Sequence, residues 1–290
     1  MNLAILGLDT SHGPAFAGII QEDYPQHRLV AAWPGGSNAI PASRDRVQGF
    51  TREVEAMAVP IVDSPETAAS NADAVFILTL DGDSHAPLLS NIMRAGQRIY
   101  IDKPMAYSPA QAEQMLHDAA RMGVQLFSAS ALRFLPLVQQ ALRESSHDPI
   151  TQLHLRAPVN PIDGVPRYHF YVIHAVEVLV TLLGSAIEVV RKDGTRAECF
   201  HIHWQSGAKA CLELNSEPHS GFDLQIERNS GSRQNFTSIE KSVAPLYGPL
   251  LEACLHFFES GKSPINSSET IAILEILKLI TDASAQQATE

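Results

Sequence analysis

Three short stretches of this sequence combine residue types that could do chemistry. The first is the turn from Gly7 to Gly13, Gly-Leu-Asp-Thr-Ser-His-Gly, which directly follows an apolar run. The second is Lys103, which follows the apolar residues Ile99-Tyr100-Ile101. The third is His174, with Glu177 three residues later, in an otherwise apolar segment. A glycine turn, a cation and an imidazole are groups that bind an anion, polarise an oxygen and move a proton.

The turn after the first apolar run is a candidate for binding the pyrophosphate of a dinucleotide, because helix N–H groups at such a turn attract anions. It departs from the fingerprint G-x-G-x-x-G, since Asp9 and His12 stand at the second and third glycine positions. An acid there adds a charge of the same sign as the phosphates. A second interpretation stays open, in which Asp9, Thr10 or Ser11 simply caps the helix.

The end of the second apolar run bears on the choice between NAD and NADP. The acid that would bind the ribose 2′-hydroxyl is missing there, and the sequence reads Ala-Trp-Pro-Gly-Gly-Ser over residues 32–37. Ser37, with Arg44 or Arg46, could suit a 2′-phosphate, although surface arginines usually have no such role. The choice between the two nucleotides stays open.

The elements that must position these groups change character near residue 127. Before it, apolar runs alternate with segments of helical period, which predicts a parallel sheet covered on both faces. Strands are expected at Leu3–Leu6, Leu29–Trp33, Ile61–Val62, Ala74–Leu80, Arg98–Ile101 and Val124–Phe127. Ser108-Pro109-Ala110-Gln111 is a capping box with proline at N1, and Gly96 and Gly123 stand where helices should end. Val47, Phe50, Thr51, Val54 and Met57 recur at helical spacing and predict a further helix.

The second half predicts an antiparallel sheet with helices on one side. The expected strands include Thr151–Arg156 and a hairpin in which Cys199–Trp204 and Ala208–Asn215 flank Gln205-Ser206-Gly207. Helices are expected at Pro136–Glu144, Tyr171–Leu183, Leu250–Glu259 and Thr270–Ala285. The domain boundary falls near residues 125 to 135, giving domains over 1–128 and 129–290.

Composition limits the class of protein. The 290 residues are 45% hydrophobic and 18% charged, which excludes disorder and collagen-like repeats. A net charge of -11 makes nucleic acid an unsuitable partner. The apolar runs are too short to span a bilayer, so we expect no membrane association and a cytoplasmic protein. Three scattered cysteines predict neither disulfides nor a metal cluster.

A larger pattern appears in the middle of the chain. The segment from Thr79 to Met105 places His85, Gly96 and Lys103-Pro104 at the spacing of the family pattern T-P-N-x-x-H, A-x-x-x-G and E-K-P, with Asp102 in place of the glutamate. Arg133-Phe134-Leu135-Pro136 matches R-[FY]-x-P, and His174 to Gly184 matches H-x-x-D-x-x-x-x-L-x-G with Glu177 for aspartate. By these motifs in this order, the chain resembles the glucose-fructose oxidoreductase and inositol dehydrogenase family, Gfo/Idh/MocA.

The resemblance implies a fold and an activity. The fold is α/β, with an N-terminal Rossmann-type doubly wound parallel sheet and a C-terminal α+β domain whose open, mostly antiparallel sheet makes a homo-oligomer, a dimer or tetramer. The activity is hydride transfer between NAD or NADP and a sugar-like or polyol substrate. That reaction needs no metal.

The resemblance also assigns roles to residues. Lys103 would hydrogen-bond the reacting oxygen, and His174 would be the general base. We expect these two side chains to face the same crevice. Substrate contacts are expected from Glu177, Arg133 and Tyr171; Glu177 could instead raise the pKa of His174. Cofactor contacts are expected from Gly7, Asp9, Thr10, Ser11, His12, Ser37, Thr79, Leu80, His85, Asp102 and Lys103.

Two departures leave other hypotheses open. The family has an aspartate four residues before the histidine, where this chain has Phe170, which neither accepts a proton nor orients an imidazole. Tyr168, His169 and Tyr171 are candidates to replace it, although aromatic residues entering a helix usually belong to the core. With the altered glycine turn, Phe170 suggests an alternative, a non-catalytic ligand-binding or regulatory protein on the same scaffold.

A third hypothesis is a metal-dependent hydrolase or lyase. His201 and His203 share one strand face and, with His154, suggest a zinc site. The spacing is weak, and a solvated or interface sheet face is the stronger interpretation.

Overall fold

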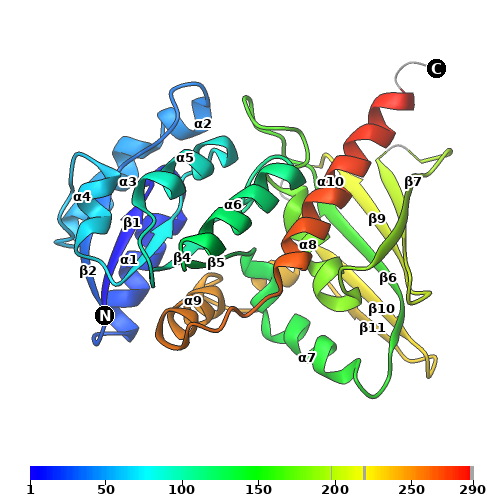
Figure 1. Ribbon diagram of the computed structural model, residues 1–290. Helices are drawn as coiled ribbons and strands as arrows, with labels where there is room; N and C mark the ends of the chain where they lie inside the picture. Colours follow the sequence, from blue (N-terminus) through cyan, green and yellow to red (C-terminus); the bar gives the residue numbers. More distant parts are fainter. Residues whose placement is uncertain (197, 218–219, 288–290) are drawn as a thin grey trace. The chain divides into compact units, whose positions relative to one another are not determined.

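The computed structural model describes residues 1–196, 198–217 and 220–287 (Figure 1). Its contacts divide the chain into two compact units. The first unit comprises Met1–Ala129, Ile162–Val165 and Leu250–Ser267, and the second comprises Ser130–Pro161, Pro166–Pro249 and the residues from Ser268 onward. The chain therefore passes between the units more than once.

The first unit contains a five-stranded parallel sheet with the strand order β2-β1-β3-β4-β5. Its strands are β1 (Asn2–Leu6), β2 (Arg28–Trp33), β3 (Ala74–Ile77), β4 (Arg98–Ile101) and β5 (Gln125–Ser128). Its helices are α1 (His12–Asp23), α2 (Pro41–Arg44), α3 (Val47–Ala56), α4 (Pro65–Ser70), α5 (Gly82–Ile92), α6 (Pro109–Arg121) and most of α9 (Gly248–Ser260). The predicted Rossmann-type sheet is confirmed, and its strands are apolar because both faces are covered.

Helix α9 comes late in the chain but packs with the first unit. The ring of Phe258 lies 4.9 Å from that of Phe76 in β3, and Phe257 lies 5.0 Å from Phe127 in β5. Arg98 at the start of β4 donates hydrogen bonds to the carbonyl oxygens of Phe258 and Glu259. The sequence places this helix in the second domain, because its local pattern does not show which sheet it covers.

Two predicted strands are shorter than expected. Ile61 forms only an isolated parallel bridge with Ala32, where the Ala32 N–H donates to the Pro60 carbonyl oxygen at 2.8 Å. Pro60 has no N–H to donate to a ladder, and Pro65 begins the next helix, so no full strand forms. Strand β3 ends at Ile77, and residues 78–80 turn toward α5.

The predicted start of α6, with Ser108 as its cap and proline at N1, is confirmed. Ser108 is the N-cap and its hydroxyl accepts a hydrogen bond from the Gln111 N–H at 3.2 Å. The helix ends at Arg121, and Gly123 follows with φ +66°, a conformation that glycine adopts without strain.

The second unit contains a six-stranded sheet with the order β11-β10-β6-β9-β8-β7. Its strands are β6 (Ile150–Pro158), β7 (Ile187–Lys192), β8 (Cys199–Trp204), β9 (Lys209–Asn215), β10 (Asp223–Arg228) and β11 (Arg233–Phe236). Neighbouring strands are antiparallel except β6 and β9, which confirms the mostly antiparallel sheet. The helices are η1 (Ala131–Phe134), α7 (Pro136–Glu144), α8 (Val172–Leu183), η2 (Ile239–Lys241) and α10 (Ser267–Gln287).

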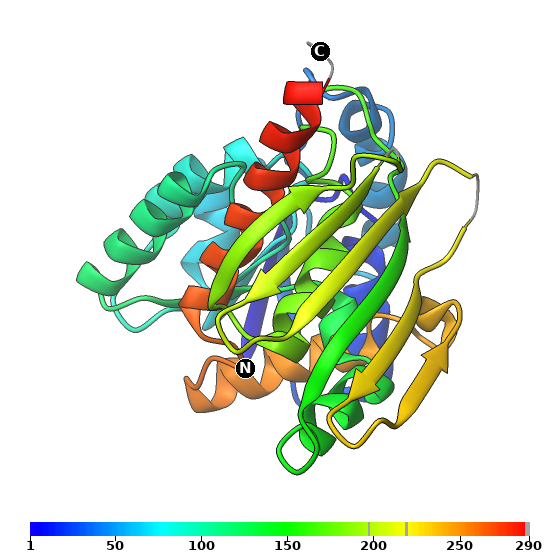
Figure 2. The ribbon, with the colours of Figure 1, turned by 90° about the vertical axis from the view of Figure 1, so that its right-hand side faces the viewer.

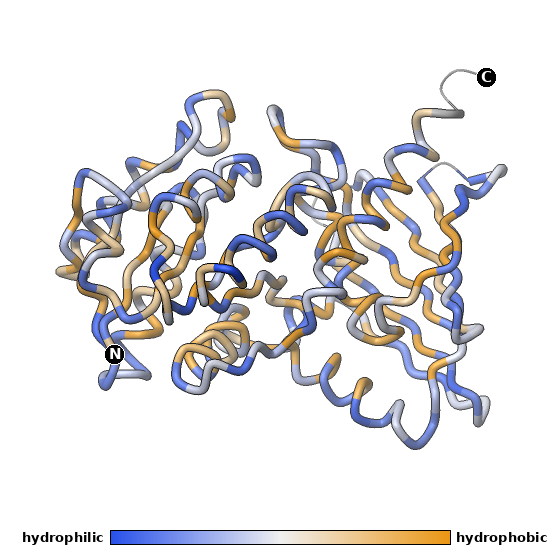
Figure 3. Tube along the Cα trace, viewed as in Figure 1, coloured by the Kyte–Doolittle hydropathy of each residue, from blue (hydrophilic) through white to orange (hydrophobic). Residues whose placement is uncertain are grey.

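The strands of this second sheet alternate between hydrophobic and hydrophilic residues, as Figure 3 shows. In β8, Phe200, Ile202 and Trp204 are buried, whereas His201 is exposed and His203 half-buried. Helix α8 packs against β6 and β9, and Figure 2 looks onto the opposite, polar face, which we call the outer face.

None of the described helices combines the length and the apolar character needed to cross a bilayer.

Candidate functional site

The turn after β1 is held against the turn after β3. Gly7 has φ +104°, and a Cβ there would lie 2.4 Å from the Thr79 backbone nitrogen. Its N–H donates to the Trp33 carbonyl oxygen at 2.9 Å. Only glycine permits this close approach, so the ends of three neighbouring strands meet around Gly7.

Asp9, at the second position of the glycine fingerprint, is fully buried and turned toward the protein. Its carboxylate accepts hydrogen bonds from the Leu80 N–H at 3.1 Å and the Ser43 hydroxyl at 2.6 Å. Burial raises the pKa of Asp9, and these hydrogen bonds oppose the shift. The carboxylate therefore joins the turns after β1 and β3 to α2 and does not cap α1, whose N-cap is Ser11. Thr10 donates from its hydroxyl to the Leu78 carbonyl oxygen at 3.3 Å.

His12, at the third fingerprint position, connects the first turn to the end of β4. Its Nδ1 lies 3.3 Å from Asp102 Oδ2, and both side chains are buried. The other carboxylate oxygen of Asp102 accepts the Lys103 N–H at 2.8 Å. Burial lowers the pKa of His12; the charge of Asp102 opposes the shift and that of Lys103 adds to it. Lys103 itself is 8% exposed, which is rare for a lysine and places its charge in the first unit's interior at the carboxyl end of the sheet.

His85 and Thr79 form a second connection at this edge of the sheet. The imidazole of His85 is fully buried, with Nε2 2.8 Å from the Thr79 carbonyl oxygen and Nδ1 3.1 Å from that of Met105. The Thr79 hydroxyl lies 2.8 Å from that of Ser84. Both predicted cofactor residues are thus engaged within the protein, and His85 fastens the end of β3 to the segment after β4.

The loop after β2 is linked to the same network through one serine. The Ser37 N–H donates to the Ser43 hydroxyl oxygen at 2.7 Å, and that hydroxyl donates to Asp9. Arg44 pairs with Asp45 at 2.9 Å, and Arg46 donates to the Ala42 carbonyl oxygen. The structure brings Ser37 and Asp9 together, whereas the two arginines make their described contacts locally.

In the second unit, the side chain of His174 contacts a serine from a distant part of the chain. The Nδ1 atom lies 2.6 Å from the hydroxyl oxygen of Ser130, the N-cap of η1. That oxygen also accepts the Leu132 N–H at 3.1 Å. The imidazole is half-buried and meets the rings of Tyr171 at 5.6 Å and Phe222 at 6.1 Å, both edge to face. One nitrogen of His174 is therefore held by a hydroxyl while aromatic rings fix the plane of the imidazole.

Glu177 and Arg133 form a buried ion pair beneath this histidine. Glu177 accepts hydrogen bonds from Arg133 Nε and from the Ser130 N–H, each at 2.8 Å. Arg133 also pairs with Glu269 at 2.7 Å. Burial raises the pKa of Glu177 and the Arg133 charge opposes the shift. Both predicted substrate residues are thus used to hold the Ser130 segment.

The residues considered as replacements for the missing aspartate lie in different surroundings. The Tyr168 hydroxyl donates to Glu198 at 2.9 Å and lies 3.0 Å from the Ser284 hydroxyl. His169 is buried. Tyr171 is half-buried and stacks on Phe222 at 5.7 Å. Instead, the Ser130 hydroxyl contacts His174 Nδ1. The sequence did not predict a role for this serine.

The three histidines of the second sheet do not converge on one point. His154 Nε2 lies 3.2 Å from Glu213, and His201 Nε2 lies 3.0 Å from Asp193. Among the described residues, Asp193, Cys199 and His201 form a group whose potential ligand atoms lie within 4.8 Å of one another.

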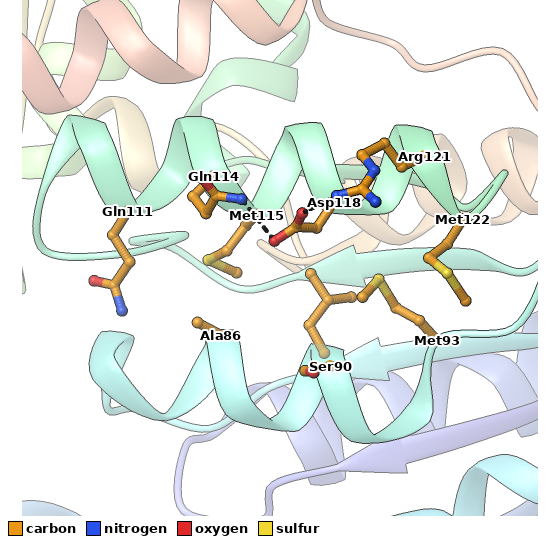
Figure 4. Close-up of a pocket in the computed structure, with 10 residues that line it drawn as sticks. Ala86, Ser90, Met93, Gln111, Gln114, Met115, Asp118, Arg121 and Met122 are labelled. Carbon is orange, nitrogen blue, oxygen red and sulfur yellow. Dashed lines mark hydrogen bonds and ion pairs between the residues drawn. The ribbon is translucent and has the colours of Figure 1, made fainter.

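A cavity of about 350 Å³ lies between α5 and α6 in the first unit (Figure 4). Methionines 93, 115 and 122 and the Gln114 to Asp118 hydrogen bond of 2.8 Å form part of its lining. Its lining contains none of the predicted site residues.

Comparison with known proteins identifies the first unit's relatives. Residues 1–130 match the family described as "Oxidoreductase family, NAD-binding Rossmann fold" (GFO_IDH_MocA). A curated relative, "Putative oxidoreductase YceM" of Salmonella typhimurium (strain LT2), is 34% identical over 98 residues. That match covers 34% of this chain and 31% of the relative, so it spans about a third of either protein. The predicted resemblance is confirmed.

Solved structures match nearly the whole chain. The scyllo-inositol dehydrogenase of Lactobacillus casei with bound NAD(H) and scyllo-inositol has a TM-score of 0.78 at 14% identity, covering 99% of this chain and 97% of that one. UDP-N-acetylglucosamine 3-dehydrogenase GnnA of Acidithiobacillus ferrooxidans has a TM-score of 0.74 at 16% identity, covering 98% and 97%. At such identities the likeness shows a shared fold.

The His12 pair makes stability depend on pH in a defined direction. Because burial lowers the pKa of His12 from 6.5, the unfolded chain binds a proton more readily than the folded one. The free energy of unfolding should therefore fall as the pH drops below about 6.5, by up to about 1.4 kcal/mol per pH unit. His12→Gln should reduce this slope in urea unfolding measured between pH 7.5 and 5, relative to wild type.

The control is the exposed His147→Gln, which should leave the slope unchanged. Equal slopes for wild type and His12→Gln would show that the His12–Asp102 pair does not cause the loss of stability at acidic pH.

Proposed function

We propose that this chain, whose residues 1–130 match the Gfo/Idh/MocA oxidoreductase family, is an NAD(P)-dependent dehydrogenase or reductase. Its substrate class is a small sugar-like or polyol molecule, oxidised or reduced at a CH–OH or carbonyl carbon. The observation that carries the proposal is the buried Lys103 at the carboxyl end of β4, beside a turn that is closed around Gly7. Open α/β sheets bind ligands at this edge.

The altered glycine turn fits a dinucleotide. The carboxylate of Asp9 is directed toward the Leu80 N–H and the Ser43 hydroxyl, and these hydrogen bonds compensate its negative charge near the helix N-terminus. Gly7 permits the tight turn after β1 that leads into α1, whose N-terminus would face the pyrophosphate. Gly7, Thr10, Ser11, Ser37 and Thr79 would hold the cofactor, with Asp9, Leu80, His12, Asp102 and His85 shaping the loops around it.

The cofactor, when bound, supplies a nicotinamide C4 that accepts or donates a hydride. Lys103 donates a hydrogen bond to the reacting oxygen and stabilises its alkoxide character. His174 takes or returns the hydroxyl proton at Nε2 while its Nδ1 stays on the Ser130 hydroxyl. Tyr171 borders the imidazole and is the remaining substrate contact among the predicted residues, since Glu177 and Arg133 pair with each other.

Ser130 takes the positioning role that Phe170 cannot. A hydroxyl both donates and accepts, so it can bond Nδ1 with or without its proton, whereas a carboxylate only accepts. Glu177 accepts the Ser130 N–H and thereby fixes the hydroxyl against His174. The residue that orients His174 therefore comes from a different part of the chain than the aspartate of the family.

The family match to an oxidoreductase does not favour the alternative of a non-catalytic binding or regulatory protein. A homo-oligomer formed through the outer face of the second sheet and a cytoplasmic location stay predictions.

Nucleotide binding is the direct test. Titration with NADH and NADPH should quench tryptophan emission and sensitise nicotinamide emission, because Trp33 ends β2 beside the Gly7 turn. Trp33→Phe should reduce the transfer while calorimetry still detects binding, and the buried Trp204→Phe in the second unit is the matched control. If neither nucleotide binds, the non-catalytic alternative is favoured instead.

Turnover tests the assigned roles. In a screen of inositols and sugars followed by nicotinamide absorbance, Lys103→Met should lower kcat by about 10² to 10³ and His174→Ala by about 10² to 10⁴. The exposed Lys209→Met is the control and should keep wild-type turnover. Full turnover of both site variants would show that the role assignment is wrong.

The role of Ser130 can be measured without a substrate. In ¹⁵N-histidine spectra, Ser130→Ala should shift Nδ1 of His174 and change its tautomer populations and titration, because it removes the 2.6 Å contact. Ser130→Thr, which keeps the hydroxyl, should restore the wild-type signals. Unchanged His174 nitrogen shifts in a folded Ser130→Ala protein would contradict the positioning role.

A further inference from the structure

Four side chains that bind soft divalent metals lie together on the outer face of the second sheet. They are Asp193, Cys199, His201 and Cys211, and all three cysteines of the chain are free thiols. Asp193 follows β7, Cys199 and His201 lie two residues apart in β8, and Cys211 lies in β9. None of them belongs to the site proposed above.

Strand register accounts for the grouping. Cys211 lies directly opposite His201 in the β8–β9 ladder, and the Asp193 N–H donates to the Cys199 carbonyl oxygen at 2.8 Å. The four side chains thus occupy adjoining positions on one face of three neighbouring strands. The ligand atoms of Asp193, Cys199 and His201 lie within 4.8 Å of one another, and the sulfurs of Cys199 and Cys211 are 3.6 Å apart.

Two of these distances match edges of a tetrahedral coordination shell. Metal–sulfur bonds of about 2.3 Å in a tetrahedron separate two sulfurs by about 3.8 Å, and metal–nitrogen and metal–oxygen bonds of about 2.0 to 2.1 Å separate their ligand atoms by about 3.3 Å. The observed separations are 3.6 Å for the sulfurs and 3.0 Å between His201 Nε2 and Asp193 Oδ2. A complete shell would require side-chain movement that also brings the Cys211 sulfur, now beside Cys199, toward His201 and Asp193.

We propose that Cys199, Cys211, His201 and Asp193 bind one thiophilic divalent cation of the zinc class, at a structural site on the outer face. Two thiolates with an imidazole and a carboxylate favour zinc over magnesium or calcium, which prefer oxygen ligands. The ion replaces the proton between His201 and Asp193 and the two thiol protons, which leave to solvent.

The carboxylate of Asp193 is already oriented for this role. Its Oδ1 accepts hydrogen bonds from the Thr195 hydroxyl at 2.7 Å, the Thr195 N–H at 2.8 Å and the Arg196 N–H at 3.1 Å. Oδ2 is thereby directed at His201. Hydrogen bonds to the second oxygen are the usual support of a metal-binding carboxylate.

A disulfide fits the two cysteines less well than a metal does. Cys199 lies opposite Glu213 and diagonal to Cys211 in the antiparallel pair. Diagonal neighbours have Cα atoms about 7 to 8 Å apart, whereas disulfides usually join Cα atoms closer than about 6.8 Å. A bridging ion spans this distance without moving the strands.

The test uses the full chain, zinc and cobalt(II), with no nucleotide present. After gel filtration in metal-free buffer, protein grown with zinc should carry about one zinc per chain by mass spectrometry. Cobalt(II) should produce the d–d bands of a tetrahedral ion and sulfur-to-cobalt charge transfer. His201→Gln and Cys211→Ser should each weaken zinc binding more than about tenfold in competition with a chromophoric chelator.

The matched controls are His203→Gln, two residues along the same strand face, and His154→Gln, which faces Glu213. Both variants should bind zinc with an affinity within about twofold of wild type. This change is much smaller than the loss expected when a metal ligand is removed. Because His201 is exposed, its variant should fold, which circular dichroism checks for every variant.

The proposal is overturned by a zinc content far below one per chain without cobalt–sulfur absorption, by unchanged affinity of folded His201→Gln, or by a Cys199–Cys211 disulfide in protein purified without reductant. These outcomes do not depend on nucleotide binding, so they leave the proposed oxidoreductase function to its own test.

Discussion

The proposed cofactor residues of the first unit and the proposed base of the second unit are each held under one constraint, which is that an ionised group removed from water must find partners inside the protein. Each unpartnered buried ion costs several kcal/mol, so the network must be nearly complete to be tolerated. In the first unit, Asp9 is satisfied by the Leu80 N–H and Ser43, and Asp102 by His12 and the Lys103 N–H. These bonds join the turns after β1, β3 and β4, so charge compensation fixes the strand edge where a cofactor would bind.

The same constraint orders the second unit. Glu177 is 2% exposed and its carboxylate is matched by Arg133 and the Ser130 N–H. Arg133 in turn reaches Glu269, 136 residues away in sequence. Removing Arg133 would leave the buried carboxylate of Glu177 without a compensating charge. Removing Glu177 would take away the acceptor of the Ser130 N–H, which holds this segment beside His174.

The sequence predicts the elements better than the partners. Arg98–Ile101, Pro136–Glu144 and Cys199–Trp204 are observed with the predicted bounds, because local signals such as proline at N1 and turn residues mark their ends. The Ile61–Val62 strand is wrong, because its ladder starts at a proline. Ser130 lies 44 residues from His174, so no local pattern indicates that this serine contacts the imidazole.

The outer face of the second sheet shows how register limits sequence interpretation. The period of two places Cys199, His201 and His203 on one face from the sequence alone. It does not say what lies across from them, since a slip of one residue would bring Leu212 or Ala210 opposite His201 in place of Cys211. The hairpin closed by Gly207, with φ +88°, fixes the pairing. The sequence groups His201 with His203 and His154, whereas the structure places His201 beside Asp193 and opposite Cys211, neighbours that are set by the turn at Gly207.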